Sequence, residues 1–418
     1  MFRCITQLKA LVIDIDDIHE DFDVWTWAVE RYQCFFITSN PDTADMLARK
    51  YGNNYIFLLK KYQKLFAPSK ATHEIVLSKL GVKTTELVYV TGNKGFIDNA
   101  MCFLCGTIWI TNRQLTYADV GTAPDLICRR VESLKNRLEE TTQGFFGETT
   151  FSKKQNITGH IVPVVFTVDD TEIHMWMLGR YFGYGHYMSQ LHPYSTAIYL
   201  NKKEGKANSI FNEHFAKLYS IAVKRIMKSN TVDAVCAVPV RPGIINRFES
   251  ILNYIAENCG IKNIDKNFSC IKNYPTQKNL SKAARQENVQ NVFEYDGDLT
   301  GKNVVLIDDI VTTGATLREC INELKWCGVQ QVFVIVLGVN QQNREYWTSA
   351  KAQVSCPNCG EAMHLLVNSN NKNFFYSCYQ CGKTLNFENG MEILHKQVNA
   401  EFENIQKENP SDSSFFTS

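Results

Sequence analysis

The sequence predicts an α/β protein of several parts. Across two long blocks, short apolar strand-like segments alternate with amphipathic helical patterns, and this order is typical of parallel sheets. A third, short block carries two Cys-x-x-Cys pairs. The chain has 418 residues, of which 44% are hydrophobic, so two or three packed domains are expected.

The domain boundaries follow from changes in composition. We expect a first α/β domain over 1–135, a linker over 136–158 that is polar and rich in Gly, Thr and Lys, and a second α/β domain over 159–345. The cysteine block over 351–395 follows. The polar, serine-ending segment 400–418 is predicted to be a flexible tail.

Charge and hydropathy exclude some classes of protein. The formal net charge is +1, which argues against binding to nucleic acid mainly through bulk charge. No apolar run of membrane-spanning length is present, so no membrane association is expected. The first residues lack the apolar run and cleavage site of a signal peptide. We therefore expect a cytoplasmic chain without a disulfide framework, although it has 14 cysteines.

The run VVLIDDIVTTGATL, residues 304–317, has the character of a ligand site. Its apolar start predicts a buried parallel strand, and Asp308 and Asp309 then fall at the carboxyl edge of the sheet, where α/β proteins bind ligands. A loop of small and hydroxyl residues precedes the next helical pattern: Thr312, Thr313, Gly314, Ala315 and Thr316. Backbone N–H groups of such a loop suit a phosphate, while the two acids suit ribose hydroxyls. The alternative is an ordinary strand–loop–helix junction with a solvated aspartate pair, but the whole run favours a ligand site.

The same run is similar to the signature for 5-phosphoribosyl 1-diphosphate (PRPP) in type I phosphoribosyltransferases. The segment 237–248 resembles the diphosphate-side loop of the ComF-like branch, and 274–295 resembles its mobile loop. The resemblance implies a parallel sheet with a hood, the hood lying within 160–205. It also implies transfer of ribose 5-phosphate from PRPP to a nitrogen acceptor, with Mg²⁺ neutralising the diphosphate.

The resemblance also implies roles for individual residues. Asp308 and Asp309 would stabilise positive charge on the ribose ring. Arg241 would contact the diphosphate, while Lys282 and Arg285 would close over it. For these three basic residues, ordinary surface charge is the alternative.

The fold does not by itself establish turnover. The rival prediction is a non-catalytic sensor of PRPP or a nucleotide that acts on a nucleic-acid or protein partner, as in competence or anti-phage defence. Type I transferases commonly pair, so a homodimer is one expected assembly.

The first block carries a second set of motifs. Asp14 and Asp16 end the first strand-like segment, and this resembles the DxD motif of haloacid dehalogenase-like (HAD) phosphatases with their Rossmannoid fold. The resemblance implies an aspartate nucleophile and a general acid. It further implies that Thr38 or Ser39 holds phosphate and that Lys70 balances its charge.

A magnesium site in this block is expected to be weak. The resemblance implies Mg²⁺ bound by Asp14, Asp16 and Asp98, but Asn93 stands where the family has a further acid. An active phosphatase that dephosphorylates the product of the transferase is one prediction. A degenerate hydrolase domain kept for binding or assembly is the other.

The third block predicts a zinc ribbon. Two knuckles supply four thiolates, which suit a closed tetrahedral Zn²⁺ site: Cys356, Cys359, Cys378 and Cys381. Between them, the aromatic residues Phe374, Phe375 and Tyr376 favour core packing over stacking on bases. The ribbon is expected to hold a domain edge, a protein partner or nucleic acid.

Overall fold

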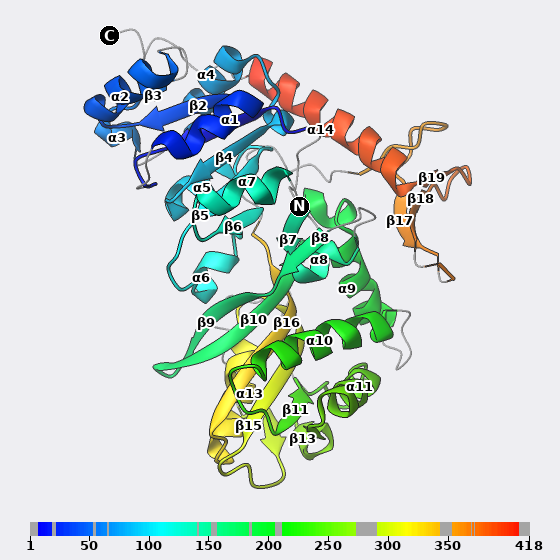
Figure 1. The fold of residues 1–418 in the computed structure, drawn as a ribbon. Coiled ribbons are helices and arrows are strands. Elements are labelled where there is room, and N and C mark those ends of the chain that lie inside the picture. Colours follow the sequence, from blue (N-terminus) through cyan, green and yellow to red (C-terminus); the bar gives the residue numbers. More distant parts are fainter. Residues whose placement is uncertain are drawn as a thin grey trace.

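The computed structural model describes most of the chain in separate stretches. These are residues 7–18, 22–52, 56–64, 67–139, 142–151, 157–183, 186–204, 211–272, 291–342, 353–368, 370–371 and 373–408. They form two six-stranded sheets, a three-stranded sheet and two two-stranded sheets, with helices packed on the larger sheets (Figure 1). The predicted α/β class with parallel sheets is confirmed. No described helix combines the length and apolarity needed to cross a membrane.

The first six-stranded sheet lies in the N-terminal unit, the described residues of 7–139. Its strand order is β3-β2-β1-β4-β5-β6, and all its pairs are parallel. The strands are β1 (Ala10–Asp14), β2 (Gln33–Thr38), β3 (Ile56–Leu58), β4 (Leu87–Thr91), β5 (Gly106–Ile110) and β6 (Leu126–Cys128). The helices are α1 (Thr26–Arg31), α2 (Pro41–Tyr51), α3 (Lys61–Lys64), α4 (Lys70–Leu80), α5 (Lys94–Ala100), α6 (Tyr117–Val120) and α7 (Glu132–Glu139).

Helices cover both faces of this sheet, which explains why its strands are continuous apolar runs. Residues of α1, α2 and α7 share one buried cluster with the sheet, and residues of α4 and α5 share the other. The Asn40 side chain starts α2 by accepting hydrogen bonds from two main-chain N–H groups, and the Ser69 side chain starts α4 by accepting one from the Thr72 N–H.

The second six-stranded sheet has the order β12-β11-β15-β16-β10-β9. Its strands are β9 (Val162–Val168), β10 (Thr171–Tyr181), β11 (Ala234–Ala237), β12 (Lys262–Asn263), β15 (Asn303–Val311) and β16 (Gln331–Asn340). Only the pair of β9 and β10 in this sheet is antiparallel. A separate hairpin pairs β13 (Phe268–Cys270) with β14 (Phe293–Tyr295).

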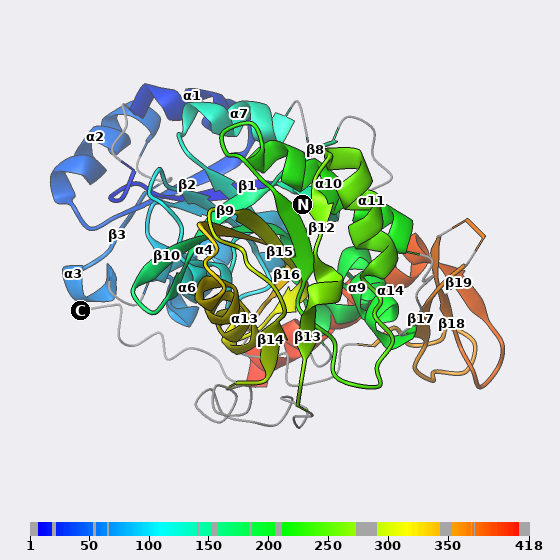
Figure 2. The ribbon, with the colours of Figure 1, turned by 90° about the horizontal axis from the view of Figure 1, so that it is seen from below.

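Helices enclose this sheet as well. Its main helices are α9 (Pro193–Glu204), α10 (Asn212–Ile226), α11 (Glu249–Cys259) and α13 (Ala315–Trp326). Figure 2 shows α13 on the opposite side of β15 and β16 from α10 and α11. The buried residues divide in the same way, because α13 shares one apolar cluster with the sheet while α10 and α11 share another. The central strand β15 is therefore buried on both faces.

The segment expected to be a linker is folded in its described part. It contains the end of α7, β7 (Thr142–Phe145), α8 (Phe146–Thr149) and the start of β8 (Ile157–His160), with β7 and β8 paired in parallel. Its polar composition is misleading because Glu148 is buried against Arg180, which lies far away in the sequence. The prediction of a bare linker over 136–158 is therefore corrected.

The C-terminal elements return to the N-terminal unit. A three-stranded sheet of β17 (His364–Val367), β18 (Phe374–Ser377) and β19 (Thr384–Asn386) leads into α14 (Phe387–Glu408), and Figure 1 shows this helix running back towards α4. Leu394 of α14 shares a buried cluster with residues of β1 and β2. Residues 400–408 of the expected flexible tail are therefore helical, while 409–418 lie outside the described residues.

A buried ion-pair network joins the N-terminal unit to the second unit, which is the second six-stranded sheet with its helices. The Arg180 side chain is 2% exposed, and its Nη1 lies 2.7 Å from Asp125 of the N-terminal unit, while Nη2 lies 2.9 Å from Glu148. His192 Nε2 lies 3.3 Å from the same glutamate. Although burial opposes it, the positive charge of Arg180 holds the pKa of Glu148 well below its usual range. A second link is Gln341, whose Oε1 accepts a hydrogen bond of 2.9 Å from the Ala123 N–H.

We predict that Arg180→Met lowers the free energy of unfolding by about 3–5 kcal/mol, because Asp125 and Glu148 are left as buried, uncompensated charges. Urea denaturation measures the change. Lys217→Met is the control, since it removes a lysine from an exposed pair with Glu213 and should leave the midpoint unchanged. Equal stabilities of the two variants would contradict the role given to Arg180.

Candidate functional site

The junction between β15 and α13 forms a tight turn around Gly314. This glycine has a φ of 74°, in the left-handed region that favours glycine. A Cβ at this position would lie 2.5 Å from the ring of Phe166 on β9. Gly314 and Ala315 are buried, Thr313 and Thr316 are half-buried, and Thr312 is exposed. The structure thus brings the predicted phosphate-loop residues together at the start of α13.

Two neighbouring acids whose pKa values shift in opposite directions precede this turn. Asp309 is 4% exposed, and it pairs with Arg247 and with Lys202, whose Nζ lies 3.2 Å from Oδ1. In spite of burial, the positive charges of Arg247 and Lys202 hold the pKa of Asp309 well below its usual range. Burial and the neighbouring charge of Asp309 raise the pKa of Asp308 to about 7. One acid is therefore ionised, and the other exchanges a proton near neutral pH.

Two further basic residues contact Asp309: Arg247, which the sequence analysis placed only within the diphosphate-side loop, and Lys202, which it did not identify. Arg247 falls in the segment that resembles a diphosphate-side loop, between β11 and α11, and its Nε is buried without a hydrogen-bond partner among the described residues. Lys202 lies on α9, where no motif marks it. Only its approach to Asp309, 107 positions away, identifies it.

Of the three basic residues predicted for this site, the structure describes only Arg241. Arg241 lies in the same loop between β11 and α11 and is half-buried. Lys282 and Arg285 lie outside the described residues. Asn246 fixes the loop from within, because its Nδ2 donates a hydrogen bond of 2.6 Å to Asp265.

Comparison with known proteins agrees with this geometry. Residues 222–360 match the sequence model of the phosphoribosyl transferase domain, and this range includes Arg247, the acid pair and the turn at Gly314. The match covers about a third of the chain. The second six-stranded sheet and its helices have the type I phosphoribosyltransferase fold expected from the sequence.

Three curated relatives match parts of the chain. Competence protein F of Haemophilus influenzae is 26% identical over 162 residues, which cover 36% of this chain and 68% of that protein. Transcriptional regulator GfcR 2 of Methanosarcina barkeri is 46% identical over 41 residues, or 10% of this chain and 20% of that protein. Ribose-phosphate pyrophosphokinase of Pyrococcus abyssi is 42% identical over 40 residues, or 10% of this chain and 14% of that protein. The last two matches thus span a fifth or less of those proteins.

One solved structure is similar over much of the chain. It is the structure of Leishmania donovani UMP synthase, with 13% identity over 80% of this chain and 72% of that one. Its TM-score of 0.20 is too low to support an argument about the arrangement of the units.

The N-terminal unit contains a second polar cluster at the carboxyl ends of β1 and β2. Asp16 accepts hydrogen bonds from the Thr38 hydroxyl and from the Ser39 N–H, at 2.8 Å for the latter. Asp14 is buried and accepts a hydrogen bond of 2.8 Å from Thr91. Burial raises the pKa of Asp14 to about 6 against the charge of the Lys64 ammonium, which contacts it. The four residues expected from the sequence to hold or attack phosphate do lie together.

Two further residues predicted for this cluster have ion-pair partners on their own helices. Lys70 lies 3.9 Å from Glu74, and a different lysine, Lys64, contacts Asp14. Asp98 is paired with Lys94, and it accepts a hydrogen bond of 2.6 Å from Thr122.

An internal cation lies beside two of the predicted Mg²⁺ ligands. The Nζ of Lys64, on α3, lies 3.3 Å from Asp16 and 3.4 Å from Asp17. Asp14, Asp16 and Asp98 do not form a cluster with metal-ligand spacing in the described part of the chain. The magnesium site stays a prediction. The HAD-like resemblance stays a prediction.

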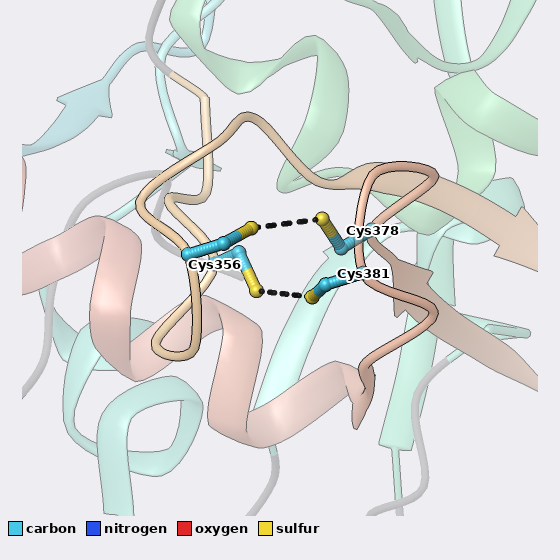
Figure 3. Close-up of side chains that lie close together, drawn as sticks. Cys356, Cys378 and Cys381 are labelled. Carbon is cyan, nitrogen blue, oxygen red and sulfur yellow. Dashed lines mark hydrogen bonds between the residues drawn. The ribbon is translucent and has the colours of Figure 1, made fainter.

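The four cysteines of the third block converge as predicted. Their Sγ atoms all lie within 4.8 Å of one another, and two of the pairs are 3.5 Å apart (Figure 3). Tetrahedral Zn²⁺ with bonds of about 2.3 Å places its sulfur ligands about 3.8 Å apart, so the thiols fit that ion. Gly360 and Gly382 each follow a knuckle with a positive φ, and each donates its N–H to the first cysteine carbonyl of that knuckle.

The aromatic residues of the ribbon are used in packing. Phe374 stacks on Phe211 of the second unit with ring centroids 6.3 Å apart. Tyr376 is fully buried against Phe387 at the start of α14. The ribbon therefore lies against the second unit at one end and leads through α14 to the N-terminal unit.

We predict a pH-dependent difference in stability between the protein and Asp308→Asn. The folded-state pKa of Asp308, about 7, exceeds the ordinary value of 3.8, so the folded state holds a proton that the unfolded chain releases. The contribution of Asp308 to the free energy of unfolding falls as pH rises from about 4 to 7. The asparagine of the variant does not titrate, so the variant does not show that fall. Above pH 7, Asp308→Asn should be more stable by on the order of 1–3 kcal/mol.

Denaturation midpoints between pH 4 and pH 8.5 measure this effect. Asp45→Asn is the control, because Asp45 is exposed on α2, and its curve should parallel that of the unaltered protein. A constant offset between Asp308→Asn and the unaltered protein at all pH values would contradict the assignment.

We also predict one tightly bound Zn²⁺ per chain, measured by elemental analysis after dialysis against a weak chelator. Cys378→Ser should lose the ion and lower the unfolding temperature, because metal binding at a four-thiolate site is coupled to folding. Cys259→Ser, which lies on α11 away from the cluster, should keep it. Unchanged zinc content in Cys378→Ser would rule out this site.

Proposed function

We propose that this protein transfers ribose 5-phosphate from PRPP to a nitrogen acceptor. The observation that carries the proposal is the acid pair near the carboxyl end of β15, half-buried Asp308 and buried Asp309, which precedes the turn at Gly314 and in which Asp309 pairs with Arg247. A buried carboxylate with two cationic partners is poised for an anionic ligand, because an incoming diphosphate competes for the same cations. The family match over 222–360 supports the same ligand class.

In the proposed reaction, the bond between C1 of PRPP and the diphosphate oxygen breaks, and a bond forms from C1 to the acceptor nitrogen. Diphosphate leaves with the bonding electrons, and the acceptor loses a proton. Positive charge develops on the ribose ring, and ionised Asp309 is suitably placed to stabilise it once Arg247 turns to the diphosphate. Asp308, with its raised pKa, donates or accepts a hydrogen bond at a ribose hydroxyl. Mg²⁺ bound with PRPP would neutralise the diphosphate.

A second candidate is a sensor that binds PRPP without turnover and acts on a protein or nucleic-acid partner. It is favoured by the match to a protein named as a transcriptional regulator, although that match covers only 41 residues. In this alternative, the contacts of Arg247 and Lys202 with Asp309 would change on binding and alter the surface offered to the partner.

The coupling expected from the N-terminal motifs is a separate proposal. Asp14, Asp16, Thr38 and Ser39 form a polar cluster, and Lys64 is its cation. In that proposal this cluster binds the phosphate of the product. Hydrolysis there requires inorganic phosphate to be released from a ribose 5-phosphate compound and the release to be lost in Asp14→Asn.

The experiment measures PRPP binding by calorimetry and diphosphate release across a panel of bases and amines with Mg²⁺. We expect micromolar binding and turnover, with turnover weakened at least tenfold in Asp309→Asn, because the variant lacks the carboxylate proposed to stabilise positive charge on the ribose ring. Binding of PRPP should be retained in Asp309→Asn, because Arg247 and Lys202 are then free of their carboxylate partner. Asp298→Asn is the control, because Asp298 is exposed and accepts its hydrogen bonds from Thr300, outside the site. Binding without turnover selects the sensor, and no binding of PRPP refutes both.

A further inference from the structure

The N-terminal unit reaches the turn at Gly314 through one side chain. Tyr117, the first residue of α6, donates its hydroxyl to the carbonyl of Thr312 at 2.6 Å. Tyr117 and Thr312 are 195 positions apart, so the contact joins the two units at the candidate phosphate loop. Burial raises the pKa of Tyr117 well above its usual range, so the hydroxyl keeps its proton as a donor.

Arg318 makes the matching contact on the next peptide. Its Nη1 donates a hydrogen bond of 2.9 Å to the carbonyl of Thr313. The guanidinium lies 4.5 Å from the centre of the Phe166 ring, and Tyr117 meets the same ring edge-on with centroids 5.2 Å apart. Tyr117, Phe166 and Arg318 therefore form a loop-support cluster beside Gly314, where an added Cβ would meet the same ring at 2.5 Å.

Holding these two carbonyls fixes the direction of two N–H groups. In a trans peptide, the carbonyl and the following N–H point in opposite directions. With the carbonyls of Thr312 and Thr313 held by the cluster, the N–H groups of Thr313 and Gly314 point away from it. Within the described stretches of chain, neither N–H has a hydrogen-bond acceptor. Successive N–H groups that point the same way are the arrangement that binds a phosphate oxygen.

Tyr117 is itself fixed by main-chain contacts between the units. The Val165 N–H of β9 donates a hydrogen bond of 2.8 Å to the Leu115 carbonyl, and Thr116 forms a parallel bridge with Val165. Asp119 then closes the first turn of α6 by accepting hydrogen bonds from Thr116, at 2.8 Å for the main-chain N–H. The hydroxyl is thus presented from a rigid element, which suits a positioning role.

We infer that Tyr117 is a positioning residue for the 5-phosphate subsite: through the Thr312 carbonyl, the N-terminal unit orients the N–H groups that would hold the phosphate. The inference rests on the proposed function for the identity of the ligand. It gives the N-terminal unit a role in the transferase site that is independent of any chemistry at Asp14. In this inference Tyr117 acts through the Thr312 carbonyl, so its effect is expected on affinity for the 5-phosphate.

The test compares Tyr117→Phe with the unaltered protein. The variant keeps the ring against Phe166 and removes only the hydroxyl. Affinity for ribose 5-phosphate should fall about 3- to 10-fold, the effect of one lost hydrogen bond, while affinity for inorganic diphosphate with Mg²⁺ stays unchanged. Tyr51→Phe is the matched control, because Tyr51 in the same unit also donates its hydroxyl to a carbonyl at 2.6 Å, but to that of Phe22.

Arg318→Met provides a second variant, since it removes the contact with Thr313 and retains an unbranched side chain over Phe166. It should show the same selective loss. Equal loss for ribose 5-phosphate and diphosphate would indicate a general structural defect and overturn the inference, as would unchanged ribose 5-phosphate affinity in Tyr117→Phe.

Amide hydrogen exchange separates this inference from the proposed function. If the unaltered protein binds neither ligand, the proposed function fails, and exchange at residues 312–316 still tests the positioning role. Tyr117→Phe should accelerate exchange there several-fold relative to Tyr51→Phe. Identical exchange in the two variants would show that Tyr117 does not order the loop.

Discussion

The buried guanidinium of Arg180 determines how the two six-stranded sheets are joined. A charge removed from water requires partners, and its partners are Asp125 from the N-terminal unit and Glu148 from the segment between the sheets. Separating the N-terminal unit from the second sheet would break the pair of Arg180 with Asp125. The strip that includes Leu115 and Thr116 is thereby kept along β9, and the contact of Tyr117 with the loop beyond β15 depends on that arrangement.

The same requirement for compensation operates at the candidate site. Asp309 is ionised because Arg247 and Lys202 neutralise it, and Asp308 retains a proton near neutral pH because burial and its neighbour oppose a second charge. Such a pair costs folding stability and favours binding of a ligand that brings its own anionic groups and hydroxyls. The N-terminal cluster is compensated in a similar way, since Lys64 supplies an internal cation to Asp14 and Asp16.

The ribbon and α14 complete one connected body. Phe374 packs on Phe211 of the second unit, while Leu394 joins the apolar cluster of the N-terminal sheet. The four clustered thiols bring the two knuckles of the ribbon together, and the elements that make both contacts lie next to these knuckles in the sequence. A metal at this position would stabilise the packing of the two units, because the strand that carries Phe374 contacts the second unit while α14 packs on the N-terminal sheet.

Local sequence determined the elements and the ligand class of this protein. Alternating apolar segments indicated the parallel sheets, and the run 304–317 placed Asp308, Asp309 and the turn at Gly314 in one site, because all of them lie within a single strand–loop–helix unit. The two Cys-x-x-Cys pairs likewise predicted the four-thiol cluster from their spacing in the sequence. Only the tertiary structure showed that Lys202, Tyr117 and Lys64 contact residues of these sites and that Glu148 is buried. Each of those contacts joins residues far apart in the chain, and charge or hydrogen-bond pairing across such distances depends on how the sheets pack, which no local pattern records.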